Sequence, residues 1–214
     1  MILITRPLAQ TANLKMLLEA SDIEYAFFPT FEVKKIRSEV LKQHYDVIIF
    51  ISVNAVSFAE DYFNKIFTGV HKVFAVGPIT AKRLIDKDIK VDCFPKFNAS
   101  SMELLAMQEC SELIDKRILI VRGKGGSETL KDNLGKFNQV DYLEVYERVP
   151  CEFSSLHAES IKVFLDSTNG VLMAGSNESL SNIVRLLNFD SSDTFNKFKT
   201  RKLIVFSQKI KVLA

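Results

Sequence analysis

Short apolar segments alternate with amphipathic ones along this chain, and that alternation limits the possible fold more than any other feature. Residues 47–51 read Val-Ile-Ile-Phe-Ile and residues 118–121 read Ile-Leu-Ile-Val, and each run precedes a segment of helical periodicity. Strands without a polar face are typical of parallel sheets that helices cover on both sides. The repeated order of strand and helix therefore predicts an α/β protein with parallel sheets.

Three of these segments recur in the same order further along the chain. Each pair shares an apolar run and one polar residue (Arg, Ser or Lys): residues 2–7 and 118–123, 47–54 and 171–177, and 72–77 and 202–207. This order predicts a duplicated architecture with two similar lobes. Residues 90–114 add a further strand and helix to one copy only, so we expect the other copy to lack a last strand–helix unit.

Two β-prone segments, residues 29–36 and 143–153, carry proline and charge and differ from flexible Gly/Ser linkers. We expect them to pair as a stiff, two-stranded connection between the lobes. Two crossings mean that one lobe is assembled from both ends of the chain and the other lobe from its middle.

The composition argues against several classes of protein. The chain has 28 basic and 26 acidic residues, and the basic residues are scattered rather than interleaved with aromatics, so we expect no nucleic-acid partner. The first residues resemble a strand and not a secretion signal, and the apolar runs are far shorter than the roughly 18 residues of a membrane span. We therefore expect a cytoplasmic protein that contacts no membrane.

The cysteines form no metal-binding or disulfide pattern. Cys93, Cys110 and Cys151 lie far apart without C-x-x-C spacing. This arrangement favours reduced thiols that pack in the interior.

The histidines also lack a catalytic or metal-binding context. His44, His71 and His157 have no carboxylate or cysteine at ligand spacing, and we expect them at the surface. No nucleophile elbow or cofactor-binding loop is recognisable. The sequence thus predicts neither a metal nor a cofactor, and any reaction has to depend on binding, shape and electrostatics.

A glycine-rich turn at residues 122–128, Arg-Gly-Lys-Gly-Gly-Ser-Glu, links a buried strand to a helix. Glycines allow the tight turn, the first N–H groups of the helix attract negative charge, and Arg122 and Lys124 add positive charge. The turn matches neither the G-x-x-x-x-G-K-[ST] nor the G-x-G-x-x-G pattern, so a nucleotide is not the expected ligand. The turn therefore predicts an anion site. The alternative is a tight turn in which Ser127 only caps the helix.

Four further loops offer hydroxyl, amide or helix N-terminal donors: residues 52–54, 77–80, 100–101 and 176–177. Three of them follow predicted strands, where ligands of open α/β sheets bind. Residues 100–103 form a capping box, and the other loops also fit helix caps. Ligand binding and capping both stay open for these loops.

An ordered set of motifs carries a resemblance to a known family. The set comprises residues 2–7 (Ile-Leu-Ile-Thr-Arg-Pro), 50–56 (Phe-Ile-Ser-Val-Asn-Ala-Val), 75–81 (Ala-Val-Gly-Pro-Ile-Thr-Ala), 100–101 (Ser-Ser), 118–126 (Ile-Leu-Ile-Val-Arg-Gly-Lys-Gly-Gly), 145–146 (Val-Tyr) and 176–177 (Ser-Asn). Together they resemble the uroporphyrinogen-III synthases, which close the linear tetrapyrrole hydroxymethylbilane. The resemblance covers essentially the whole chain.

The resemblance implies two flavodoxin-like α/β lobes joined by a two-stranded β connection, with the substrate in the cleft between them. Residues 1–33 and 150–214 would form one lobe and residues 37–143 the other. Such an enzyme is a cofactor-free lyase that expels a terminal hydroxyl as water and closes the ring through a spiro intermediate, which inverts ring D. Unassisted closure gives the uninverted isomer I. The implied partners are hydroxymethylbilane, which bears eight carboxylates, and transiently hydroxymethylbilane synthase, and the implied state is a monomer.

The resemblance also implies the site residues. Tyr146 would donate a hydrogen bond to the departing hydroxyl, and Thr80 would orient the substrate, although Tyr146 also fits a packed linker aromatic. The expected substrate-binding residues are Arg6, Ser52, Asn54, Gly77, Ser100, Ser101, Arg122, Gly123, Lys124, Ser176, Asn177 and Lys209.

One segment departs from the family pattern. Residues 206–211 lack the second Gly-Pro-x-Thr-like turn of many members, and we expect Lys209 to replace that contact as a carboxylate partner. This departure motivates the alternative function, a non-catalytic two-lobed protein that binds a tetrapyrrole or another anionic metabolite.

Overall fold

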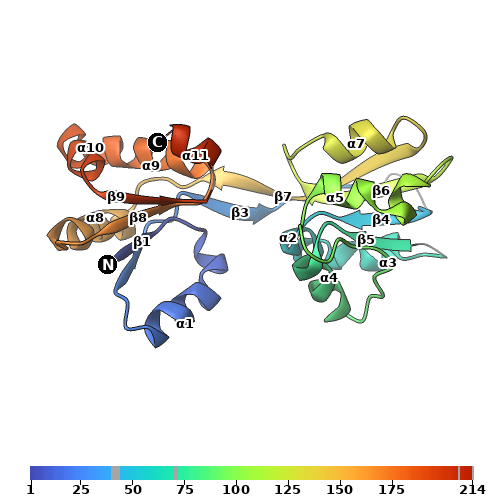
Figure 1. The fold of residues 1–214 in the computed structure, drawn as a ribbon, viewed down its shortest axis with the longest axis horizontal. Coiled ribbons are helices and arrows are strands. Elements are labelled where there is room, and N and C mark those ends of the chain that lie inside the picture. The colour runs from blue at the N-terminus through green and yellow to red at the C-terminus, as the bar shows by residue number, and fades with distance from the viewer. Residues whose placement is uncertain (40–43, 70–71, 207, 214) are drawn as a thin grey trace. The chain divides into compact units, whose positions relative to one another are not determined.

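The computed structural model describes residues 1–39, 44–69, 72–206 and 208–213, except for the side chains of residues 209 and 213. The chain divides into two compact units: unit 1 contains Met1–Val33 and Arg148–Ala214, and unit 2 contains Lys34–Glu147. The chain passes between the units in β3 (Phe31–Lys35) and again in β7 (Gln139–Pro150), which are neighbours in one sheet. Unit 1 is therefore built from both ends of the chain, blue and orange to red in Figure 1.

Unit 1 contains a parallel sheet with the strand order β2-β1-β8-β9 (Figure 1). Its strands are β1 (Ile2–Ile4), β2 (Tyr25–Phe27), β8 (Val171–Ala174) and β9 (Lys202–Val205). Ile2 lies opposite Tyr25 on one side and Val171 on the other, so β1 is a central strand. The first strand of the chain thus lies inside the sheet.

Helices of unit 1 cover both faces of this sheet. They are η1 (Leu8–Gln10), α1 (Ala12–Ala20), α8 (Ser155–Asp166), α9 (Asn177–Asp190), α10 (Ser192–Lys199) and α11 (Gln208–Leu213). Leu3 and Leu172 join a core with residues of α8 to α11, whereas Ile4 and Met173 pack with Leu18 of α1. Because successive residues of a strand point to opposite faces, both faces have to be apolar. This arrangement explains the apolar runs in the sequence.

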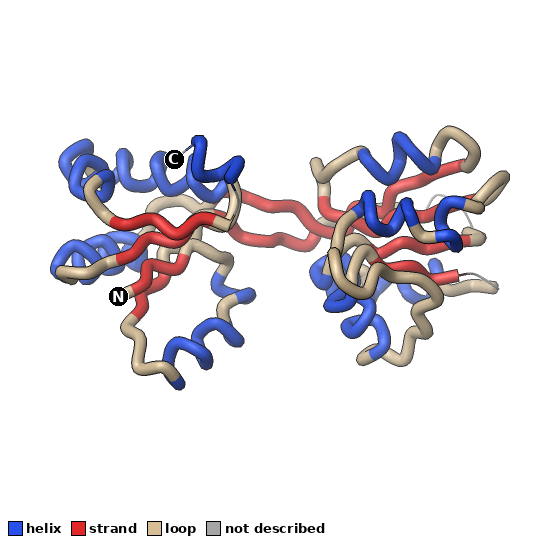
Figure 2. The backbone as a smooth tube through the Cα atoms, viewed as in Figure 1, coloured by secondary structure: helices blue, strands red, loops and turns tan. Residues whose placement is uncertain are grey.

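Unit 2 contains a sheet with the order β3-β7-β6-β4-β5, shown by the red strands of Figure 2. Its remaining strands are β4 (Val47–Phe50), β5 (Lys72–Ala75) and β6 (Arg117–Gly123), and β7, β6, β4 and β5 run parallel. A further segment extends the β5 edge, because Cys93 forms a parallel bridge with Phe74 and its carbonyl accepts the Ala75 N–H at 3.0 Å.

Helices also cover both faces of the unit 2 sheet. They are α2 (Val53–Phe58), η2 (Glu60–Tyr62), α3 (Phe63–Ile66), α4 (Pro78–Ile85), α5 (Ser101–Ala106), α6 (Gln108–Ser111) and α7 (Thr129–Leu134). Val47 and Ile49 of β4 pack in a core with residues of α5, α6 and α7. Phe50 instead contacts Phe63 and Phe67, with ring centroids 6.3 Å apart in each pair. Alternate residues of β4 therefore serve two separate helical layers.

The two sheets share one strand order, β2-β1-β8-β9 in unit 1 and β7-β6-β4-β5 in unit 2. Strands β1 and β6 hold the second place, β8 and β4 the third, and β9 and β5 the fourth. These are the three pairs of segments that resemble each other in sequence. The repeated strand order confirms the two similar lobes predicted from the sequence. The lobes differ in chain order: unit 1 begins with β1 in the second place, whereas the repeated strands of unit 2 begin with β4 in the third.

The single helix expected within residues 90–114 is two helices, α5 and α6. Met107, between α5 and α6, has an extended backbone with φ −72° and ψ 140°. Its Sδ atom lies 3.5 Å from Sγ of Cys93, in the segment that extends the sheet. The interruption thus brings a methionine from the helical layer onto the sheet edge.

The expected surface position is wrong for His157, which is 2% exposed. Its Nδ1 atom accepts from the N–H and lies 2.8 Å from the hydroxyl of Ser154, in a capping box that begins α8, and Nε2 lies 2.9 Å from the Pro29 carbonyl oxygen. His44 is partly exposed beside Asp46, and His71 lies outside the described residues. Cys93, Cys110 and Cys151 are all buried, which confirms the prediction that they pack in the interior.

Candidate functional site

Three predicted site residues meet at the carboxyl edge of the unit 2 sheet: Ser52 after β4, Gly123 at the end of β6, and Tyr146 in β7. Ser52 Oγ and Tyr146 Oη lie 3.1 Å apart. Ser52 Oγ also accepts the Ala55 N–H at 3.0 Å, as the N-cap of α2. Tyr146 is 5% exposed and contacts the Phe58 ring. The tyrosine is thus packed in the linker strand and hydrogen-bonded at the same time.

A register shift between β6 and β7 positions the tyrosine. Arg122 lies opposite Glu144, but the next residue, Gly123, lies opposite Tyr146, so β7 contains one extra residue at this point. Such bulges redirect side chains in a sheet. A Cβ atom at position 123 would lie 2.4 Å from the Tyr146 ring, and the Lys124 N–H donates to the Tyr146 carbonyl at 2.8 Å. Only glycine allows this close approach.

The other predicted residues of unit 2 begin three helices. Gly77 precedes Pro78 at the start of α4, and a Cβ atom there would lie 2.3 Å from Ala99 Cβ. The missing side chain of Gly77 therefore leaves room for Ala99, the residue before Ser100. Ser100 Oγ caps α5 by accepting the Glu103 N–H at 3.1 Å. Within the helices, Thr80 is buried in α4, while Asn54 of α2 and Ser101 of α5 are half-buried. Ser52 and Ser100 thus cap their helices, as one of the two interpretations predicted. Whether these loops also bind a ligand stays a prediction.

Arg122 lies in an unexpected environment, because it is 2% exposed. Its guanidinium donates to the carbonyl oxygens of Gly123 at 3.0 Å and Ser127 at 3.3 Å. It also pairs with Glu128 at 2.9 Å and lies 4.2 Å from the centroid of the Tyr142 ring. The positive charge expected for an incoming anion therefore already has partners in its own turn.

Glu128, which is itself exposed, is the acidic partner of this buried arginine. The Tyr142 hydroxyl donates to Glu128 at 2.7 Å, and this bond, followed by that from Arg122, lowers the pKa of Glu128. Burial, and then the bond to Glu128, raises the pKa of Tyr142 to about 12. Glu128 occupies the N-cap position of α7 but makes no side-chain cap hydrogen bond. Ser127 Oγ instead accepts the N–H of Thr129, the first residue of the helix, at 3.3 Å, which agrees with the capping alternative for Ser127. Lys124 is the exposed cation of the turn.

In unit 1, the predicted residues Arg6 and Ser176 line one cavity of about 190 Å³. Arg6 follows β1, and Ser176 follows β8 and caps α9 by accepting the Ser179 N–H at 3.0 Å. The cavity is also lined by Arg148, which sequence reasoning missed, and by the rings of Phe31 and Phe206. Arg148 follows the family motif Val145-Tyr146 by only two residues, and that proximity was its sole signal in the sequence.

Thr5 and Ser179, which line this cavity, form hydrogen bonds with each other and with the neighbouring Thr30. Thr5 Oγ1 donates to the Met173 carbonyl at 2.6 Å, and Thr30 Oγ1 donates to the Thr5 carbonyl at 3.1 Å. Ser179 Oγ lies 3.1 Å from each of the two threonine oxygens. The hydroxyls tie the end of β1, the segment after β2 and the start of α9 together.

Two predicted residues of unit 1 remain to be placed. Asn177 is the first residue of α9, and its Oδ1 atom is buried without a hydrogen-bond partner in the described part of the chain. Lys209 belongs to α11, but its side chain lies outside the described residues.

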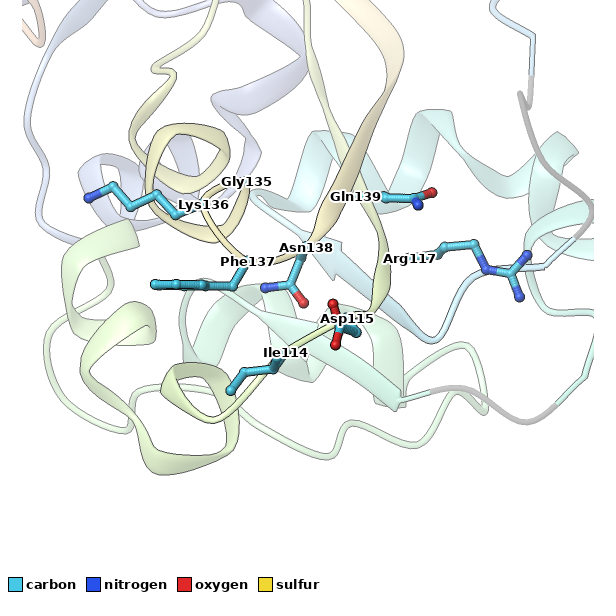
Figure 3. A pocket seen from close by; sticks show the side chains of 8 residues that line it. All are labelled: Ile114, Asp115, Arg117, Gly135, Lys136, Phe137, Asn138 and Gln139. Atoms are coloured by element: carbon cyan, nitrogen blue, oxygen red, sulfur yellow. The ribbon is translucent and has the colours of Figure 1, made fainter.

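A second hollow, of about 700 Å³, lies at the opposite edge of the unit 2 sheet (Figure 3). Arg117 and Gln139, the first residues of β6 and β7, line it together with Asn138. The Asn138 amide nitrogen donates to the carbonyls of Leu113 at 2.8 Å and Leu134 at 3.0 Å, so it serves the turns themselves. Because ligands of parallel α/β sheets bind at the carboxyl ends of the strands, the candidate site lies at the other edge.

Among the described residues, no group of three or more His, Cys, Asp or Glu side chains is placed to hold a metal ion. No helix in the described part of the chain is both long enough and apolar enough to cross a membrane.

Comparison with known proteins assigns the family. A family model described as uroporphyrinogen-III synthase HemD matches residues 12–209. The chain belongs to this family. Membership agrees with the resemblance seen in the sequence motifs and with the two α/β units.

Curated uroporphyrinogen-III synthases align with part of the chain. The enzyme of Proteus mirabilis is 28% identical over 114 residues, which are 51% of this chain and 57% of the relative. The enzyme of Escherichia coli (strain K12) is 30% identical over 107 residues, 48% of this chain and 44% of the relative. The chain thus matches about half the length of these relatives.

Solved structures of the family share the fold. A mutant uroporphyrinogen III synthase of the extremely thermophilic bacterium Thermus thermophilus superposes with a TM-score of 0.59 at 14% identity, covering 95% of this chain and 82% of that one. The uroporphyrinogen-III synthetase of Helicobacter pylori 26695 gives a TM-score of 0.57 at 13% identity, with coverage of 99% and 96%. At such identities these matches establish the uroporphyrinogen-III synthase fold alone.

Proposed function

We propose that this protein is an active uroporphyrinogen-III synthase. It cyclises hydroxymethylbilane with loss of water and inversion of ring D, which gives uroporphyrinogen III. The observation that carries the proposal is the hydroxyl pair of Ser52 and Tyr146, held over Gly123 at the carboxyl edge of a sheet, in a chain of this family. Departure of a hydroxyl requires a proton donor and no redox step, so the reaction as proposed needs neither a metal nor an organic cofactor.

The hydrogen bonds around Ser52 direct the tyrosine proton toward the substrate. Either hydroxyl of the pair is able to donate. Ser52 Oγ already accepts the Ala55 N–H, so its own proton is free to point at Tyr146 Oη. In that arrangement Tyr146 accepts from Ser52 and keeps its O–H for the departing hydroxyl of the substrate. Each bond in such a chain polarises the next, which makes Tyr146 the better donor.

The carboxylates of the substrate require donors in each unit. In unit 2 we propose Lys124, with the N-terminal residues of α2, α4 and α5, as the groups that bind them: Ser52, Asn54, Gly77, Thr80, Ser100 and Ser101. In unit 1 we propose Arg6, Ser176, Asn177 and Lys209. Backbone N–H and hydroxyl groups donate to carboxylates. Using them avoids the free-energy cost of burying many long cationic side chains.

Arg122 has a different part in the proposal. Its guanidinium is buried among Gly123, Ser127 and Glu128. We therefore propose that it positions the turn, and that the turn positions Lys124 and Tyr146. Gly123 serves by leaving room for the tyrosine ring.

The test is to supply fresh hydroxymethylbilane and resolve the isomers formed. We expect isomer III from the wild-type chain, and a rate reduced about 100-fold in Tyr146→Phe, as for loss of a general acid. Tyr25→Phe is the matched control. The Tyr25 hydroxyl donates to Glu19 in an exposed hydrogen bond, and both residues lie far from Ser52 and Tyr146 in the sequence. Formation of isomer I alone, at the unassisted rate, would refute catalysis. In that event, tight binding of uroporphyrinogen would favour the non-catalytic alternative.

The remaining partners follow from the chemistry of the substrate. Because hydroxymethylbilane closes unaided to isomer I, we propose a transient encounter with hydroxymethylbilane synthase in the cytoplasm. We also propose that the protein acts as a monomer. Co-incubating the two enzymes tests the encounter. We expect less isomer I than when the same amount of hydroxymethylbilane is released first and the chain is added afterwards.

A further inference from the structure

The cavity of unit 1 contains two arginines that converge from different strands. Arg6 follows β1, and Arg148 lies in β7, and both line the same space of about 190 Å³. We propose that Arg148 acts with Arg6 to bind one carboxylate arm of the substrate in this cavity. In the absence of substrate Arg148 pairs with Glu178, and the carboxylate of the arm replaces Glu178 as its partner. The proposed function supplies the identity of the ligand, and the inference rests on it to that extent.

The charge around the cavity favours one incoming anion. Arg6 is exposed and, within the described residues, has no ion pair, and its guanidinium carbon lies 5.8 Å from the centroid of the Phe206 ring. Arg148 lies 5.5 Å from the centroid of the Phe31 ring and, among the described residues, has one carboxylate partner, Glu178. Two cations against one anion leave a net positive charge. Guanidinium forks over aromatic rings are suited to a planar carboxylate.

The size of the cavity sets which part of the substrate fits. A volume of 190 Å³ corresponds to about six water molecules at the liquid volume of about 30 Å³ each. That space accepts a carboxylate with a short alkyl stem and excludes a tetrapyrrole. The aromatic walls, Phe31 and Phe206, suit the methylene groups of such an arm. Ser176, also at the wall, offers a hydroxyl.

The ion pair between Arg148 and Glu178 is suited to exchange. Nη1 of Arg148 lies 3.5 Å from Oε2 of Glu178, and the two side chains are 52% and 45% exposed. Charge-assisted hydrogen bonds are usually about 2.7–2.9 Å long, so this contact is loose and contributes little stability. Glu178 is the second residue of α9, where the helix dipole favours a negative charge even after Arg148 has left it.

The experiment compares five variants with the wild-type chain. Arg148→Met removes the charge and keeps the stem, Arg148→Lys keeps the charge without the fork, and Glu178→Gln removes the competing carboxylate. The double variant Arg148→Met/Glu178→Gln completes the cycle. Lys162→Met is the matched control, because Lys162 is an exposed cation of unit 1 on α8 that does not line the cavity. Each protein is tested for KM and kcat in cyclisation, and for binding of uroporphyrin III, a stable octacarboxylate that needs no turnover.

We expect Arg148→Met to raise KM and the dissociation constant of uroporphyrin III about tenfold with little change in kcat, as for loss of one charge-assisted contact. Arg148→Lys recovers part of the loss, and Lys162→Met behaves as wild type. Glu178→Gln tightens binding about threefold, the scale of a surface ion pair, but only when Arg148 is present. Unchanged melting temperatures would show that the effects arise at the site.

The outcomes separate this inference from the proposed function. If the wild-type chain forms no isomer III while Arg148→Met still weakens uroporphyrin binding relative to Lys162→Met, the proposed function fails and the cavity assignment stands. If isomer III forms and Arg148→Met matches Lys162→Met in both KM and binding, the function stands and the cavity assignment is overturned. If Glu178→Gln tightens binding equally with and without Arg148, the exchange is refuted.

Discussion

Arg6 in unit 1 and Arg122 in unit 2 hold equivalent places in a repeated sequence segment, but Arg6 is exposed whereas Arg122 is only 2% exposed. Arg122 is fixed by Glu128, by two carbonyl oxygens and by the Tyr142 ring. Arg6 has only a ring contact with Phe206 among the interactions of the described residues. A duplicated residue has thus taken on two duties, one that shapes a turn and one that is available to a ligand.

The difference arises from the residues next to each arginine. In unit 2 the turn contains an acidic residue, Glu128, at the distance from Arg122 needed for a 2.9 Å pair. In unit 1 Pro7 follows Arg6, and η1 begins directly after it. The arginine of unit 1 therefore has no acidic partner in its own turn. Four predictions test this contrast.

The largest effect is expected from Arg122→Met. Removing the guanidinium leaves the carbonyl oxygens of Gly123 and Ser127 without this donor, and Glu128 keeps only its bond from Tyr142. We expect the free energy of unfolding to fall by about 3 kcal/mol. Hydrogen exchange of the β6 amides measures the loss in unit 2, and the β1 amides of unit 1 serve as an internal reference. A loss no larger than that of Arg6→Met would remove the contrast.

The next effect concerns the glycine that follows Arg122. In Gly123→Ala the new Cβ atom would lie 2.4 Å from the Tyr146 ring, and we expect a destabilisation of about 1–3 kcal/mol from overpacking. Gly175→Ala in unit 1 is the control, because its Cβ atom meets Phe206 at an ordinary 3.6 Å. Thermal unfolding compares the two variants, and equal shifts would mean that Tyr146 moves aside at little cost.

Acid should affect the two turns differently. The Tyr142 hydroxyl and then Arg122 lower the pKa of Glu128 below its ordinary value of 4.5. A group with a lowered pKa stabilises the fold above the unfolded value, and that contribution is lost as the pH falls through the folded value. We expect protection of the β6 amides, corrected for intrinsic exchange, to decline below about pH 4.5. This part of the decline should be absent in Glu128→Gln and from the β1 amides, and an identical profile in Glu128→Gln would contradict the assignment.

The smallest effect on stability is expected from Arg6→Met. Arg6 is exposed and forms no ion pair with the described part of the chain, so its loss should change the free energy of unfolding by no more than about 0.5 kcal/mol. The same variant should still weaken uroporphyrin III binding, since Arg6 lines the cavity of unit 1. Chemical denaturation and equilibrium titration measure the two quantities. A large loss of stability with unchanged binding would give Arg6 the structural duty of Arg122.

Much of the fold could be predicted because strands covered on both faces have a simple signature. Ile2, Leu3 and Ile4 alternate between two helical layers, so all three had to be apolar. The interruption at Met107 was not predicted: its extended backbone has no signal in the local sequence, and its contact with Cys93 is seen only in the folded unit. The burial of His157 depends likewise on the Pro29 carbonyl from the other end of the chain.

The candidate site was predictable at the level of loops and not of side-chain environment. Ser52, Ser100 and Ser176 were identified as loop residues, and each of them caps a helix. The sequence could not show that a register shift in β7 turns Tyr146 toward Gly123, because a bulge depends on pairing with β6. For the same reason Arg148 was missed, since only the folded unit brings it to the cavity that Arg6 lines.

The buried hydroxyls of Thr5, Thr30 and Ser179 contain three protons for four short contacts. Thr5 gives its proton to the Met173 carbonyl and Thr30 gives its proton to the Thr5 carbonyl, so Ser179 has one proton for two threonine oxygens, each 3.1 Å away. The Ser179 O–H can therefore point at either threonine oxygen, and both orientations contain the same number of hydrogen bonds. Because Ser179 also lines the cavity, a bound carboxylate is able to select one orientation by rotating a single O–H bond, without moving any heavy atom.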